Sequence, residues 1–77
     1  MPLGNGIKVR FGQRLRELRR ARGLSQEELP FRAGLHRTYV SSAERGQRNV
    51  ALVNLEKLSN ALEIDIADLF RDMSTGT

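Results

Sequence analysis

The chain has 77 residues, enough for one small domain, and it contains no cysteine and a single histidine, His36. This composition excludes a disulfide framework and a thiolate metal site, and it would make a His-based metal site or a Ser-His-Asp triad depend on one side chain. The net charge of +4 is unevenly spread, because eleven Lys and Arg accompany four Asp and Glu between Lys8 and Arg48, whereas two accompany five from Asn49 onward.

The basic part of the chain starts after a predicted flexible arm at residues 1–6, which hold two glycines and a proline. A first helix follows, because apolar residues recur at intervals of four, four and three along one face: Ile7, Phe11, Leu15 and Leu18. Gly23 is expected to end this helix in a left-handed conformation, with Leu24 folding back over the last turn.

A second, short helix is predicted from Gln26 to about Ala33. Ser25 is its expected N-cap, and Glu28 stands three residues further on, as in a capping box. Pro30 would be its fifth residue and would remove the amide that bonds to the carbonyl of Gln26, so we expect a distorted first turn or a loss of stability there.

Three more helices complete the prediction. The third has His36 at its N-cap and ends at Gly46, the fourth runs from about Leu52 to Leu62, and the last is short, with Asp65 as its N-cap. No segment favours a strand. The sequence therefore predicts an all-α, five-helix domain at residues 7–71, followed by a flexible tail at 72–77.

The second and third helices form a unit with the spacing of a helix-turn-helix, since only Gly34 and Leu35 separate them. In this motif the second helix enters the DNA major groove and presents its first turns to base edges. The outward positions predicted for that helix are Arg37, Thr38, Ser41 and Ser42. Ten of the eleven cations before Asn49 are arginines, which suit phosphates and base edges.

Two runs are specific in combination: Leu-Ser-Gln-Glu-Glu-Leu at 24–29 and Glu-Arg-Gly at 44–46, with fifteen residues between Leu29 and Arg45. They resemble the phage repressor/Cro-type (Xre-type) helix-turn-helix family over Phe11 to Phe70. Within that family, residues 37–49 look most like the controller proteins of restriction–modification systems. Pro30 and Ala43 depart from the family pattern.

The resemblance implies a role for each of several groups of residues. Base contacts would come from Arg37, Thr38, Ser42 and Arg48. Contacts with backbone phosphates would come from Gln26, Tyr39, Ser41 and Asn49. A partly buried salt bridge would join Arg19 to Glu44 and hold the recognition helix at a fixed angle.

A homodimer is expected, because a domain of this size leaves apolar residues beyond its core: Val53, Ile64, Ile66, Leu69 and Phe70. Paired across a two-fold axis, they would set two recognition helices ~34 Å apart on double-stranded operator DNA. The expected function is transcriptional regulation, with control of a restriction–modification operon implied by the resemblance. A second dimer on one operator and a contact with RNA polymerase stay open.

The main alternative is a protein-binding module, an antitoxin with secondary DNA binding, although few residues remain for a toxin-binding segment. An enzyme is not expected, because nothing around His36 supplies a second catalytic group. Asp65, Asp68 and Asp72 are interpreted as a helix cap and a solvated face, so neither a metal nor a cofactor is expected. No apolar stretch is long enough to span a membrane, no secretion signal is seen, and the cytoplasm is the expected location.

Overall fold

The computed structural model describes residues 6–71 and residue 73, and among these it contains helices and no strand. Four α-helices, Ile7–Ala21 (α1), Glu28–Ala33 (α2), Arg37–Glu44 (α3) and Leu52–Leu62 (α4), precede a 3-10 helix, Ile66–Phe70 (η2). The all-helical prediction is confirmed, but the prediction of a fifth α-helix is wrong. The last segment has five residues, and its backbone becomes extended at Arg71, so the tighter 3-10 form takes its place.

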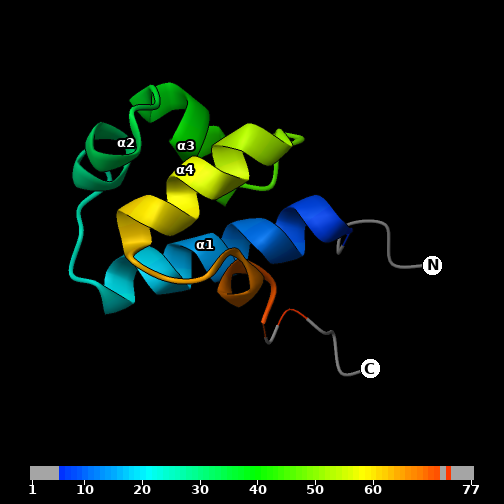
Figure 1. The fold of residues 1–77 in the computed structure, drawn as a ribbon. Helices are drawn as coiled ribbons and strands as arrows, with labels where there is room; N and C mark the ends of the chain where they lie inside the picture. Colours follow the sequence, from blue (N-terminus) through cyan, green and yellow to red (C-terminus); the bar gives the residue numbers. More distant parts are fainter. Residues whose placement is uncertain (1–5, 72, 74–77) are drawn as a thin grey trace.

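The helices pack around one cluster of buried apolar side chains. Figure 1 shows their arrangement. Helix α1 runs across the lower part of the view, and α2 and α3 meet in a corner at the top. Helix α1 packs against α3 and η2, while α4 packs against α2 and η2. The largest completely buried side chains are Leu15, Leu29, Leu58, Leu62 and Leu69.

Two predictions about the C-terminal part need correction. Leu69 was expected at a dimer surface, but it is 0% exposed because η2 turns it between α1 and α4. Met73 was expected in a flexible tail, but it is buried in the same core. The remaining residues of the predicted arm and tail, 1–5, 72 and 74–77, lie outside the described part of the chain, and Gly6 is the N-cap of α1.

Helix α2 begins at Glu28, two residues later than predicted, and it contains Pro30. The capping box is present: the Ser25 hydroxyl accepts a hydrogen bond from the Glu28 amide at 3.0 Å, and the Glu28 carboxylate accepts one from the Ser25 amide at 2.8 Å. Pro30 is the third residue of the helix. The amides on either side of it, those of Leu29 and Phe31, bond to the carbonyls four residues back, at 3.4 and 3.2 Å, so the turn forms around the proline.

The turn between α2 and α3 depends on Gly34, whose φ of 72° lies in the left-handed region. The Leu35 amide then bonds back to the Pro30 carbonyl at 2.9 Å, which closes the end of α2 and aims the chain into α3. His36 is the N-cap residue of α3, as predicted, although its side chain makes no capping bond.

Helices α1 and α3 approach each other very closely at Gly12. A Cβ atom at this position would lie 2.5 Å from the Ala43 carbonyl oxygen and 2.6 Å from that of Glu44. Only glycine permits this contact, because no side-chain movement could relieve a clash with backbone atoms. The close approach sets the position of α3 on the rest of the domain.

A buried ion pair stands beside this contact, where the family resemblance implied one. The Arg19 guanidinium donates to both carboxylate oxygens of Glu44, at 2.7 and 3.1 Å, and also to the Leu24 carbonyl at 2.9 Å. Both side chains are almost completely buried. The fork geometry and the additional carbonyl partner satisfy the buried charges and fix the end of α3 against α1.

Candidate nucleic-acid interface

The outer face of α3 carries a shallow polar hollow lined by four side chains: Arg37, Thr38, Ser41 and Arg45. They recur at intervals of one, three and four along the helix, which places them on one face. Two of the four are arginines, and the other two offer hydroxyl groups. A face with cations and small hydroxyls can donate to phosphate oxygens and to base edges.

Sequence reasoning missed Arg45 as a member of this face. Its guanidinium donates to the Ser41 hydroxyl at 2.5 Å and to the Gln47 side-chain oxygen at 3.3 Å. The available signal was spacing, since Arg45 follows Ser41 by four residues and Arg37 by eight.

Arg37, at the start of the same face, is paired with an acid from the preceding segment. Its Nη2 atom lies 3.3 Å from Oε2 of Glu27, the residue just before α2, and both side chains are more than half exposed. This pair brings the start of α2 close to the start of α3. Gln26, a predicted phosphate contact, is exposed directly before Glu27.

Ser42 does not lie on the outer face, contrary to the prediction. It is 8% exposed, and its hydroxyl donates to the Tyr39 carbonyl at 2.8 Å while accepting from Nε of Arg48 at 3.0 Å. A helix turns by about 100° per residue, so Ser42, one residue after Ser41, points toward the loop after α3 and away from the outer face. The prediction therefore included one residue too many on that face. The Ser42 hydroxyl instead orients Arg48.

Tyr39 completes this group and fixes the loop after α3. The guanidinium carbon of Arg48 lies 4.7 Å from the centre of the Tyr39 ring, a cation–π contact. The Tyr39 hydroxyl also accepts a hydrogen bond from the Ala51 amide at 3.4 Å, which partly replaces the missing side-chain cap of α4. Asn49, a predicted phosphate contact, is exposed within the same loop.

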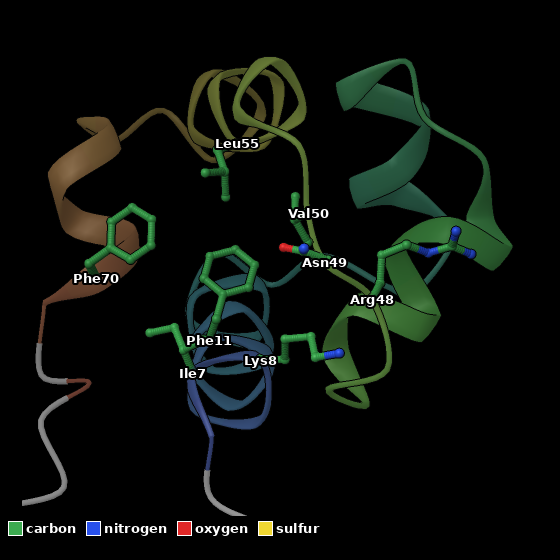
Figure 2. Close-up of a pocket in the computed structure, with 8 residues that line it drawn as sticks. All are labelled: Ile7, Lys8, Phe11, Arg48, Asn49, Val50, Leu55 and Phe70. Atoms are coloured by element: carbon green, nitrogen blue, oxygen red, sulfur yellow. The ribbon is translucent and has the colours of Figure 1, made fainter.

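On another side of the domain, an apolar hollow opens between the start of α1, this loop, α4 and η2 (Figure 2). Phe11 and Phe70 face each other there with ring centres 5.7 Å apart, and Leu55 and Val50 line the hollow with them. Lys8 and Arg48 also border it.

The predicted dimer residues are only partly available at the surface. Val53 is 62% exposed, Phe70 43% and Ile66 40%, whereas Ile64 is half-buried against the core and Leu69 is buried completely. Three residues that were not predicted are also exposed: Phe31 at 86%, Leu52 at 74% and Ile7 at 56%. The exposed large apolar residues therefore lie at the start of α4, at the start of α1, on η2 and, for Phe31 alone, on α2.

Two carboxylates have lowered pKa values, and both are structural. The backbone amide of Ser25 lowers the pKa of Glu28, with help from the Ser25 hydroxyl, and the Arg71 guanidinium lowers that of Asp68.

The described residues contain no group of three potential metal ligands, although Asp72, one of the three aspartates considered in the sequence, lies outside them. None of the helices described is long and apolar enough to cross a membrane.

Comparison with known proteins places this arrangement in a family. Residues 15–69 match the profile of the family described as Helix-turn-helix. The control protein C.MunI of a Mycoplasma species is 51% identical over 70 residues, which are 90% of this chain and 95% of that protein. The control protein C.BamHI of Bacillus amyloliquefaciens is 50% identical over 66 residues, or 84% of this chain and 82% of that protein.

A solved structure gives the same result. The restriction–modification controller protein C.AhdI from Aeromonas hydrophila superposes with a TM-score of 0.79 at 64% sequence identity, over 80% of this chain and 94% of that one. These relatives are regulators by name, and none of the three is named as an enzyme. The chain therefore belongs to the helix-turn-helix family and, within it, is a relative of the restriction–modification control proteins.

Proposed function

We propose that the chain is a sequence-specific DNA-binding regulator of transcription that acts as a homodimer and controls a restriction–modification operon. The observation that carries this proposal is the rigid presentation of α3. Its outer face combines arginines and hydroxyls, while Gly12 and the buried Arg19–Glu44 pair hold its inner face on α1. About half of the aligned residues are identical to those of proteins named as control proteins: 51% over 70 residues in one and 50% over 66 residues in the other.

In this proposal α3 lies in the major groove. Arg37 and Thr38 contact base edges, and Arg45, Ser41 and Gln26 contact phosphates on either side of the helix. The guanidinium fork of Arg37 matches the two acceptors of a guanine edge. Phosphate contacts fix the position of the helix along the duplex and carry no sequence information by themselves.

The loop after α3 supplies the remaining contacts. Arg48 reaches a base or the minor groove from its position over the Tyr39 ring, and Asn49 contacts a phosphate. The Tyr39 hydroxyl accepts from the Ala51 amide, which leaves its own proton for donation to a phosphate oxygen. In this proposal Ser42 does not contact a base, because its hydroxyl accepts a hydrogen bond from Arg48 and holds that side chain in place.

Two subunits would join through the exposed apolar residues of α4 and η2, with Val53, Ile66 and Phe70 at the contact. A two-fold dimer sets two copies of α3 about one DNA turn apart. Activation requires a contact with RNA polymerase, and self-limitation requires a second dimer on the same operator. We include both in the proposal, together with a cytoplasmic location.

A reporter gene driven by the DNA upstream of the chain's own coding sequence tests this function. The chain is supplied from a second, adjustable promoter, and Arg37→Ala serves as the control. A regulator that activates and then limits its own operon raises reporter expression at low dose and lowers it at high dose, and the variant does neither. Unchanged expression at every dose would contradict the function, and a purely downward response would contradict the activating half.

A further inference from the structure

The strongest unassigned feature of the α3 face is the acid beside its first arginine. Glu27 and Glu28 are adjacent in sequence, yet they perform different tasks. Glu28 accepts a hydrogen bond from the Ser25 amide and closes the capping box of α2. The Glu27 carboxylate instead lies 3.3 Å from Nη2 of Arg37, across the turn between the two helices.

We infer that Glu27 is a positioning residue that makes Arg37 select for sequence, an inference that rests on the proposed function. A guanidinium has five N–H donors in a fixed planar fork. The Glu27 carboxylate faces Nη2, a nitrogen that has two N–H groups, so the second of these and the neighbouring nitrogen still form a two-donor fork for a base edge. The carboxylate also keeps the guanidinium from turning to a phosphate, the acceptor that any DNA sequence offers.

The charge of Glu27 has a second, separate effect. Its side chain is 64% exposed at the start of α2, beside the face proposed to meet the duplex. A carboxylate near phosphates opposes every DNA complex and lowers affinity for random DNA and for the correct site alike. The ratio of specific to random affinity therefore depends on the pairing of Glu27 with Arg37 and not on the charge alone.

Exposure of both partners means that the pair contributes little to folding, since exposed ion pairs are worth ~0–1 kcal/mol. Glu27→Gln is therefore expected to fold with an unchanged thermal midpoint. It should bind random DNA roughly two- to fivefold more tightly, the fold-change that corresponds to losing one exposed charge pair. Preference for the correct base pair at the position read by Arg37 should fall about fivefold or more.

The chain offers a matched control on the next residue. Glu28→Gln removes one negative charge from the same turn and keeps a side chain that can cap the helix, but Glu28 has no contact with Arg37. If charge alone matters, both variants change all affinities equally. If pairing matters, only Glu27→Gln lowers the ratio of specific to random affinity.

The test uses a duplex selected by the wild-type chain from a randomised library, its single-base-pair variants, and a scrambled duplex of equal length. The inference predicts a lower specificity ratio for Glu27→Gln, an unchanged ratio for Glu28→Gln, and no further change of that ratio by Glu27→Gln on an Arg37→Ala background. Equal ratios for the two glutamine variants, or the same loss in the absence of Arg37, would overturn it. Failure of the wild-type chain to prefer any selected duplex would instead overturn the proposed function.

Discussion

Single side chains on α3 divide into those proposed to read bases and those proposed to hold phosphates, and substitution separates the two roles. Arg37→Ala should weaken binding to a selected duplex by ~1–3 kcal/mol and leave binding to scrambled DNA nearly unchanged. Arg45→Ala should weaken both complexes alike and reduce the salt slope by ~1, the value of one phosphate contact. Fluorescence anisotropy titrations at several salt concentrations measure both effects. An equal loss from Arg37→Ala on the two duplexes would show it to be a phosphate contact.

The capping box at Ser25 gives a prediction that does not depend on DNA. The pKa of Glu28 is lowered in the folded chain, chiefly by the Ser25 amide. Because the folded-state value lies below the unfolded one, this stabilisation is complete above the ordinary range of glutamate and is lost as the pH falls through the lowered pKa. An NMR titration should place the Glu28 midpoint below that of an unperturbed glutamate. A midpoint at or above the ordinary value would contradict the hydrogen-bonded geometry.

The same cap is tested by substitution. Ser25→Ala removes the hydroxyl that accepts the Glu27 and Glu28 amides, so it should lower the free energy of unfolding by ~1 kcal/mol. Urea denaturation followed by circular dichroism measures the change. Stability equal to that of the wild-type chain would show that solvent replaces the cap without cost.

At the scale of elements, the crossing of α1 and α3 is the contact that most constrains the DNA-facing helix. Gly12→Ala would place a methyl group within 2.6 Å of two carbonyl oxygens, so the helices must separate. Overpacking of this kind costs about 1–3 kcal/mol. Gln13→Ala, an exposed neighbour on α1, is the control and should change stability by less than ~0.5 kcal/mol. Matching denaturation midpoints for the two variants would contradict the close approach.

The elements also show what a sequence pattern can predict. Apolar spacing and glycine stops predicted α1, α3 and α4, because these are local signals. The start of α2 was misplaced by two residues, since the register of Pro30 in the first turn depends on how its ring packs in the core. Leu69 was assigned to a surface because its burial arises from α1 and α4, which lie far from it in sequence.

The polar site follows the same division between local and tertiary information. Helical spacing places Arg37, Thr38 and Ser41 on one face, and it would also have placed Arg45 there. The engagement of Ser42 with Arg48, and the pairing of Glu27 with Arg37, depend on how the loop and the turn fold back. Helical spacing alone cannot predict these two contacts, because each joins residues of different elements.

At the scale of the whole molecule, the exposed apolar residues proposed for the dimer contact differ from the residues of the core. Substitutions can therefore test dimer formation and folding separately. Val53→Asp puts a charge on a residue that is 62% exposed, so the domain should stay helical and sediment as a monomer. Leu69→Asp buries a charge in the core and should unfold it. Phe31→Asp is the control, since Phe31 is 86% exposed and belongs to α2, which is not one of the elements proposed for the contact, and it should leave the dimer intact. A Val53→Asp variant that remains dimeric would remove α4 from the interface.

The excess of Lys and Arg between Lys8 and Arg48 predicts a steep dependence of DNA binding on salt. A dimer that neutralises ~6–10 phosphates loses ~10³–10⁵ in affinity between ~50 and 200 mM salt, because counterions are released on binding. Titrations across that range with one selected duplex measure the slope. A flat response would contradict the electrostatic contribution of the arginines.

The measurement that tests the central claim most directly is selection of bound duplexes from a randomised library, followed by sequencing. A homodimer that reads DNA with two copies of α3 should enrich a sequence with two half-sites related by a two-fold axis, their centres about one DNA turn, ~34 Å, apart. Arg37→Ala should lose the preference at one position in each half-site. Enrichment of a single unpaired site would contradict the dimer, and no enrichment at all would contradict sequence-specific recognition.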